Sequence, residues 1–101
     1  MEINEIQTRI IEIANNRAKK KGIEITPEIS FIHLTEEFGE LARQLSNKQM
    51  RPDLYDEENL KEEIIDIILE CLILAKLFNT NLEQEFKKKI ELLAKKHTPN
   101  P

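Results

Sequence analysis

Four acidic residues are spaced so that two helices could bring them together around a metal ion. Glu37 and Glu40 lie three residues apart, and Glu63 and Asp66 repeat this spacing further along the chain. Residues three apart share one face of a helix, so two helices packed side by side would aim four carboxylates at one point. At about 4 Å, two like charges repel by about 4 kcal/mol at an effective dielectric constant of about 20, and a divalent cation between them turns this repulsion into attraction.

The types of these side chains favour a hard cation and a phosphorylated substrate. All four ligands would be oxygen atoms, which favours Mg²⁺ or, as its substitute, Mn²⁺ over zinc or copper. His33 and His97 follow Ser30 and Ala94 at the spacing where a di-iron bundle has glutamate, which argues against a di-iron site. Mg²⁺ held by a few carboxylates keeps positions for water and a phosphate oxygen, and it can activate that water. The chain contains no glycine-rich phosphate loop, which argues against a P-loop enzyme.

A solvated helix face is the alternative explanation for these acids, because glutamate is common on protein surfaces. The second pair weighs against it. Between residues 64 and 78, only Asp66, Glu70 and Lys76 are not apolar, so Asp66 belongs to a segment that is expected to be buried. A buried carboxylate must be protonated, paired with a cation or bound to a metal. Glu70, one helical turn after Asp66, could be a further ligand or could lie behind the ligands.

Amphipathic segments with apolar residues at helical spacing must position these side chains. Helices are expected over residues 2–20, 27–45, 57–78 and 82–96. Thr26 is expected to cap the second helix, and Asp53 or Asp56 the third. Thr80 and Glu83 have the spacing of a capping box at the start of the fourth. Four helices joined by short loops predict an all-α, four-helix bundle-like fold. The third helix is apolar on nearly all sides, which predicts a central helix or one shared with another subunit.

The remaining segments are expected to be irregular. Residues 46–56 should form a loop, and residues 97–101 a frayed tail. Lys48 and Arg51 in the loop could reach a phosphate, although such residues more often keep a loop soluble. The basic run at 19–21 is interpreted as a charged helix end, where the helix dipole favours cations, rather than as a nucleic-acid patch.

Length and composition restrict the class of protein. The chain has 101 residues, 34% of them charged, and a formal net charge of −4, so it has no general attraction to nucleic acid or to an anionic membrane. Cys71 is the only cysteine, which excludes an intramolecular disulfide and favours a reducing compartment. The N-terminus lacks the features of a signal peptide, and the longest apolar stretch is too short to span a bilayer. We therefore expect residues 1–101 to form one cytoplasmic domain with no nucleic-acid or membrane partner.

The two acidic stretches resemble a known signature. They read EEFGEL at residues 36–41 and EEIID at residues 62–66. This is similar to the Glu-Glu-x-x-Glu and Glu-x-x-Asp motifs of the all-α nucleotide pyrophosphohydrolases, the MazG-like superfamily. The resemblance covers most of the chain and implies a MazG-type fold that is completed by formation of a homodimer or homotetramer. It also implies Mg²⁺-dependent hydrolysis of a nucleoside or deoxynucleoside triphosphate to the monophosphate and pyrophosphate, a reaction that can remove unwanted nucleotides.

The resemblance also implies roles for individual residues. The metal ligands would be Glu37, Glu40, Glu63 and Asp66. Glu36 would orient or deprotonate the attacking water. Lys89 matches a lysine that touches substrate phosphates in many relatives, whereas Leu93 and Lys96 replace the asparagine and arginine that follow it there. The Tyr-His pair that usually follows the second motif in phosphoribosyl-ATP pyrophosphohydrolases is missing, which argues against that branch.

Two points stay open at the level of the sequence. His33, one turn before Glu37, could contact the base of the substrate, or it could be a half-buried histidine held by a neighbour. Phe31 and Tyr55 are the candidates for stacking on the base. Because the signature of the last helix is weakened, the alternative function is a non-catalytic helical module that dimerises or binds a nucleotide or protein partner.

Overall fold

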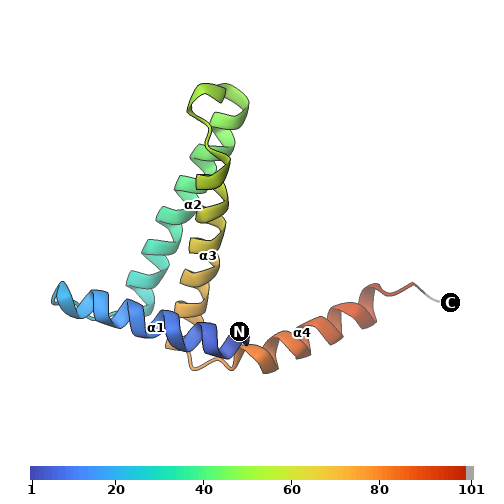
Figure 1. Cartoon of the computed structure of the whole chain (residues 1–101). Helices are drawn as coiled ribbons and strands as arrows, with labels where there is room; N and C mark the ends of the chain where they lie inside the picture. Colours follow the sequence, from blue (N-terminus) through green and yellow to red (C-terminus); the bar gives the residue numbers. More distant parts are fainter. Residues whose placement is uncertain (100–101) are drawn as a thin grey trace.

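Two long helices lie side by side and form a hairpin that dominates the molecule (Figure 1). In the computed structural model, which describes residues 1–99, α2 spans Pro27–Met50 and α3 spans Glu57–Leu77. A short 3₁₀ helix, η1, spans Pro52–Leu54 and joins them. No strand occurs among the described residues. The predicted all-α class is therefore confirmed.

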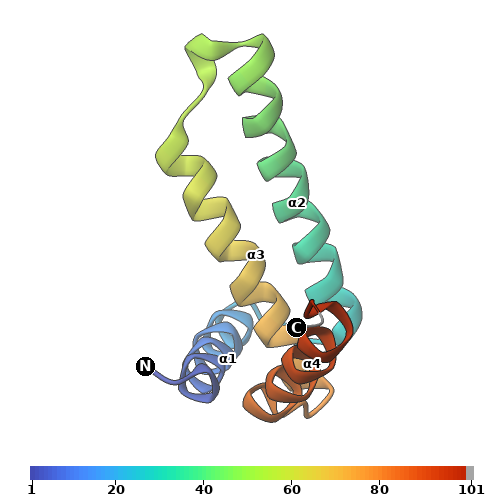
Figure 2. The ribbon, with the colours of Figure 1, turned by 90° about the vertical axis from the view of Figure 1, so that its right-hand side faces the viewer.

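The other two helices lie at the foot of the hairpin and extend in opposite directions (Figures 1 and 2). α1 spans Ile3–Lys20 and packs against α3, whereas α4 spans Leu82–His97 and contacts the start of α1. Asn4 holds this contact, because the backbone N–H of Glu83 donates to its Oδ1 at 3.3 Å. The four predicted helices are all present, but α4 projects away from the hairpin, so a single chain does not close a bundle.

Most of the predicted helix ends agree with the structure. Thr26 caps α2, and its Oγ1 accepts a hydrogen bond from the backbone N–H of Ile29 at 3.2 Å. Asp56 caps α3 in the same way, with the N–H of Asn59 donating at 3.2 Å. Asp53, the other candidate for this cap, instead pairs with the Arg51 guanidinium at 3.2 Å. These caps fix where the two helices of the hairpin begin.

The predicted capping box of α4 was wrong. Asn81 caps this helix, since its Oδ1 accepts from the N–H of Gln84 at 3.2 Å. Thr80 belongs to the turn that ends α3, where Asn79 has a positive φ of 55° and the Thr80 N–H donates to the carbonyl of Ala75 at 3.0 Å. This pattern is typical of a helix C-terminus that closes through a left-handed residue. The cap therefore falls one residue later.

The loop predicted over 46–56 was wrong for its first five residues, which belong to α2. Residues 46–50 contain neither glycine nor proline, so nothing stops the helix before Arg51. Pro52 then restricts the residue before it to non-helical conformations, and Arg51 has φ −137° and ψ 66°. The longer helix places the connection at the far end of the hairpin.

Few side chains are buried within one chain. The buried apolar residues are Ala18, Leu34, Leu72, Ile73 and Leu82. The third helix was expected to be buried on nearly all sides, yet Ile65 and Ile68 on α3 are 54% and 48% exposed. The expectation fails for the single chain because α1 and α2 cover only part of α3. The alternative prediction, that this helix is shared with another subunit, stays a prediction.

The ends of the chain bear on two further predictions. His97, predicted to begin a frayed tail, is the last residue of α4, and residues 98–99 are not helical. Residues 100–101 of the predicted tail, and of the predicted single domain, lie outside the described residues. None of the described helices combines the length and apolar character needed to cross a membrane.

Candidate metal centre

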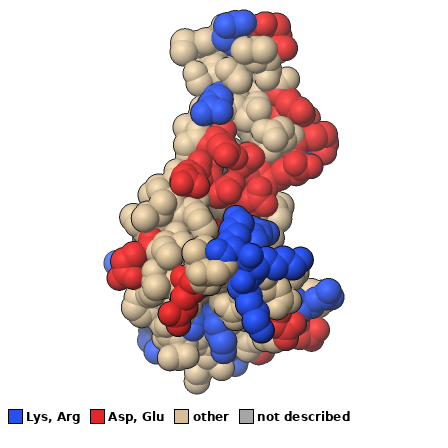
Figure 3. Space-filling view, turned by 90° about the vertical axis from the view of Figure 1, so that its left-hand side faces the viewer, with Lys and Arg blue, Asp and Glu red and all other residues tan. Residues whose placement is uncertain are grey.

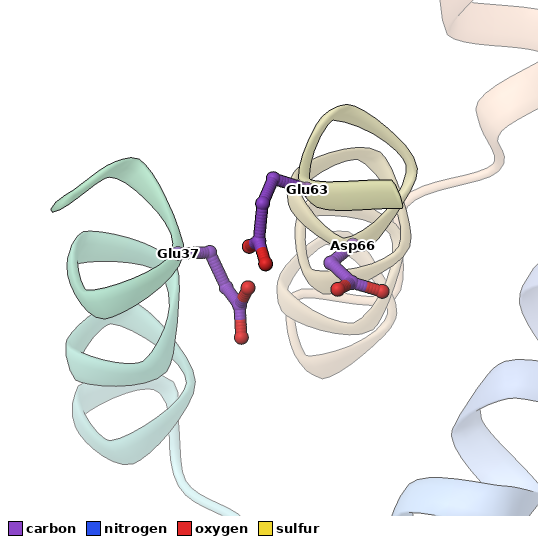
Figure 4. A group of neighbouring side chains, drawn as sticks. All are labelled: Glu37, Glu63 and Asp66. Carbon is purple, nitrogen blue, oxygen red and sulfur yellow. The ribbon is translucent and has the colours of Figure 1, made fainter. Parts of the chain in front are cut away.

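Three of the four predicted ligands meet between α2 and α3 (Figure 4). Glu37 points from α2 toward α3, and Glu63 and Asp66 come from successive turns of α3. One carboxylate oxygen from each residue lies within 4.8 Å of the other two. Oxygens that bind one Mg²⁺ at about 2.1 Å lie at most about 4.2 Å apart, so small side-chain rotations would bring these three around one cation.

No cationic side chain among the described residues pairs with these three carboxylates. Glu63 is only 6% exposed and Glu37 is half-buried, whereas Asp66, whose apolar segment was expected to be buried, is exposed. The Oε2 atoms of both glutamates are buried and have no hydrogen-bond donor among the described residues. None of the ion pairs in the described part of the chain involves Glu37, Glu63 or Asp66. Buried acids without a cationic partner are costly, so a bound divalent cation fits this donor set.

Proximity raises the pKa of Glu63 from 4.5 to about 7. The largest cause is Glu37, to which a protonated Glu63 would donate a hydrogen bond. Burial of Glu63 is the second cause, followed by the hydrogen bond and negative charge of Glu40. Without a cation, the cluster therefore retains a proton near neutral pH. A metal ion would displace that proton.

The other two predicted acids lie nearby in different positions. Glu40 is outside the group of three close oxygens and is exposed, but it is near enough to raise the pKa of Glu63. Glu36 precedes Glu37 on α2 and is exposed to solvent. Because both side chains are exposed, each can change rotamer freely. Their predicted roles, Glu40 as a ligand and Glu36 beside the attacking water, stay predictions.

His33 and Glu70 extend the polar side of the site by one helical turn. Ser30 donates a hydrogen bond to Glu70 Oε1 at 3.0 Å, and His33 Nδ1 lies 4.0 Å from the same oxygen. His33 is half-exposed, whereas only 16% of the Glu70 side chain is exposed. Glu70 is thus held behind the three-carboxylate group rather than in it. His33 has a carboxylate neighbour and lines a cavity, and its contact with the base of a substrate stays a prediction.

A cavity of about 290 Å³ opens beside the carboxylates, between α1, α2 and α3. Its acidic lining consists of Glu37, Asp66 and Glu70. Its basic lining consists of Arg17 and Lys21 from the end of α1, and its remaining wall is mainly isoleucine and alanine. Figure 3 shows Lys and Arg side chains gathered beside Asp and Glu side chains on one face of the molecule. The cavity therefore offers anionic, cationic and apolar surfaces side by side.

The structure does not bring the other proposed substrate contacts to this cavity. Lys89 lies on α4 in a separate shallow hollow with Lys88 and Lys95. Phe31 and Tyr55 are not among the residues that line the cavity. The ring of Tyr55 instead lies 5.7 Å from the Lys48 ammonium, near the far end of the hairpin. No aromatic side chain is therefore among the described residues that line this cavity.

Three lining or supporting residues were missed by sequence reasoning. Ser30 shares a helical face with His33 and Glu37, so the spacing of three and seven residues could have indicated it. Arg17 and Lys21 are four residues apart and share a face of α1, a signal that the sequence also contains. The basic end of α1 was interpreted only as a complement to the helix dipole, because the sequence does not tell which face of α1 meets the site.

Comparison with known proteins assigns most of the chain. The family model of the MazG nucleotide pyrophosphohydrolase domain matches residues 25–99. This range contains α2, α3 and α4 with all of the predicted ligands, and it leaves α1 outside. Comparisons with curated proteins and with solved structures gave no significant match.

Proposed function

We propose that this chain, which belongs to the MazG nucleotide pyrophosphohydrolase domain family, hydrolyses nucleoside triphosphates to the monophosphate and pyrophosphate with Mg²⁺ as its cofactor. The observation that carries the proposal is the group formed by Glu37, Glu63 and Asp66, whose oxygens converge without a cationic partner among the described residues. Family membership alone would not require these side chains to converge. Their convergence supports a catalytic domain over a purely helical binding module.

The residues of the site would divide the task as follows. Glu37, Glu63 and Asp66 would hold Mg²⁺, with Glu40 completing the set from the next turn of α2. When bound, the ion polarises a phosphoryl oxygen and lowers the pKa of water for in-line attack. Glu36, exposed beside the cluster, would accept a proton from the attacking water and orient it. Mn²⁺ has the same ligand preference and would substitute for Mg²⁺.

The substrate would occupy the cavity next to these carboxylates. His33 lines it one turn from Glu37 and can donate a hydrogen bond to the nucleoside. The wall of aliphatic side chains excludes water from the part of the substrate that is not phosphate. The absence of aromatic side chains from this lining favours contact with the base through aliphatic surfaces and hydrogen bonds.

The test is release of pyrophosphate from a panel of nucleoside and deoxynucleoside triphosphates with Mg²⁺ or Mn²⁺. Glu37→Gln and Asp66→Asn should each lower the rate by about 100-fold or more, because each removes a charged metal ligand. Glu58→Gln, which removes an exposed carboxylate from the same helix as Asp66, should leave the rate unchanged. If the unmodified protein releases no pyrophosphate from any member of the panel with either metal, the proposal is wrong.

The same reasoning supports assembly with a second copy of this chain, as a homodimer or as a pair of dimers. Phe31, Phe38 and Leu45 recur every seven residues along α2 and are all more than half exposed, at 56%, 51% and 53%. Such a stripe is typical of a helix that packs against another helix. Isoleucines on α3 and apolar side chains on α4 are also exposed and offer further apolar surface. Assembly would also let α4 of one protomer, with Lys89, approach the site of its partner.

A further inference from the structure

The cavity beside the carboxylates contains two cations that the metal site does not use. Arg17 and Lys21 both line it, together with Glu37 and Asp66. None of the ion pairs in the described part of the chain involves Arg17 or Lys21. Two positively charged side chains therefore line a site for an anionic substrate, and neither forms an ion pair with an acid among the described residues.

The end of α1 is held firmly enough to place these cations. Ala18, one residue after Arg17, is buried, and its carbonyl accepts hydrogen bonds from the N–H groups of Lys21 and Ile23, both at 3.0 Å. In the first half of α1, the buried Gln7 donates from Nε2 to the carbonyl of Leu72 at 3.1 Å, which ties α1 to α3. Arg17 lies in the last turn of α1, and Lys21, four residues later, is the C-cap residue that directly follows this helix.

A triphosphate bound at this site needs positive charge in addition to the metal. The tail of a nucleoside triphosphate carries several negative charges, and here it would lie against Glu37, Glu63 and Asp66. One divalent cation offsets only part of that total. Among the residues that line the cavity, the only permanent cations are Arg17 and Lys21, and Lys89 lies in a different hollow of the same chain.

We propose that Arg17 and Lys21 bind the β- and γ-phosphates of the substrate, the half that leaves as pyrophosphate. This inference rests on the proposed pyrophosphohydrolase function. It assigns substrate binding to α1, which lies outside the part of the chain that the family model matches. The Arg17 guanidinium can bind two phosphate oxygens at once, and the Lys21 ammonium acts as a point charge. The aliphatic wall is then left for the nucleoside.

Two neighbouring lysines provide a matched control. Lys19 and Lys20 occupy the same last turn of α1, are exposed and do not line the cavity. The double variants Arg17→Gln/Lys21→Gln and Lys19→Gln/Lys20→Gln each remove two positive charges from the same helix end. They therefore have the same effect on net charge and on the helix dipole, and they differ only in which charges face the cavity.

The experiment is isothermal titration calorimetry with Mg²⁺ and non-hydrolysable α,β-imido triphosphates of the common nucleosides and deoxynucleosides, alongside the matching monophosphates. Arg17→Gln/Lys21→Gln should weaken triphosphate binding by about tenfold or more, because each lost contact is a charge-assisted hydrogen bond. It should leave monophosphate binding within about twofold. Lys19→Gln/Lys20→Gln should change neither affinity by more than about twofold.

Each other outcome has a definite meaning. Equal losses in the two double variants would overturn the inference, since the effect would then come from general charge. Equal losses for triphosphate and monophosphate would also overturn it, because the cations would then contact the nucleoside or the α-phosphate. If the unmodified protein binds a triphosphate and Arg17→Gln/Lys21→Gln binds it equally well, only this inference fails. If the unmodified protein binds no triphosphate, the proposed function fails with it.

Discussion

At the scale of single residues, Glu63 determines how the site responds to protons. Its pKa is about 7 in the folded chain and 4.5 in the absence of neighbours. Folding therefore takes up a proton between pH 4.5 and about 7, and the folded state holds more protons than the unfolded state there. The free energy of unfolding of the metal-free protein consequently falls as the pH rises through this interval, and it levels off above it.

Replacing Glu63 by glutamine should remove this loss of stability at high pH. Glutamine resembles the protonated acid and carries no charge at any pH, so metal-free Glu63→Gln should be more stable than the unmodified protein at pH 8, by up to about 3 kcal/mol. The two proteins should be nearly equal in stability at pH 5. Thermal unfolding in EDTA at the two pH values measures the difference, and Glu62→Gln, an exposed neighbour, should show none.

Magnesium should reverse that order at pH 8. A cation that binds only the folded state stabilises the unmodified protein by mass action, and Glu63→Gln has lost a ligand. If Glu63→Gln is less stable than the unmodified protein in EDTA at pH 8, ionised Glu63 does not destabilise the metal-free protein.

The acids of the site could be predicted from the sequence because their spacing is a local property. Glu37, Glu63 and Asp66 follow from helical periodicity and from the apolar context of α3. Spacing places Ser30 on the helix face of Glu37, and Arg17 four residues before Lys21, but it does not show what either side chain contacts. Ser30 contacts a residue on another helix, and Arg17 reaches the cavity only because of how α1 crosses the hairpin. Such contacts depend on the angle between helices, which periodicity does not encode.

At the scale of helices, whether an end could be predicted depends on the local residues at that end. Thr26 and Pro27 marked the start of α2 correctly, because a cap and a proline act locally. The end of α2 was placed too early because the polar residues at 46–50 can occur in a helix as well as in a loop. The start of α4 at Leu82 was predicted correctly, but its cap was not, because the backbone N–H of Thr80 takes part in the turn that ends α3.

A buried polar contact links α1 to the hairpin. Gln7 is 6% exposed and donates to the Leu72 carbonyl of α3. Gln7→Ala removes a buried hydrogen bond and should lower the free energy of unfolding by about 1–2 kcal/mol. Urea unfolding measures the change, and Gln49→Ala on the exposed side of α2 is the control that should cost far less. Equal effects of the two changes would contradict a positioning role for Gln7.

At the scale of the whole molecule, a single chain leaves many large hydrophobic side chains exposed. Leu82 is the only residue of α4 that is buried, while Phe86 and Ile90 on the same helix are 48% and 64% exposed. A helix of 16 residues without an apolar partner is marginal in water. The sequence predicted the apolar stripe of α4, but the stripe does not determine which helix covers it. A second copy of this chain would supply that partner.

If folding is completed by assembly, stability should depend on protein concentration. The melting temperature of the unmodified protein should rise as its concentration rises, because dissociation accompanies unfolding. Ile68→Asp places a charge on the exposed apolar side of α3 and should yield a single chain by light scattering, with no concentration dependence and with reduced helicity from α4. Ile13→Asp is the matched control, since Ile13 is also 48% exposed but lies on α1. A melting temperature that is independent of concentration, together with the mass of one chain for the unmodified protein, would show that α4 is stable without a partner.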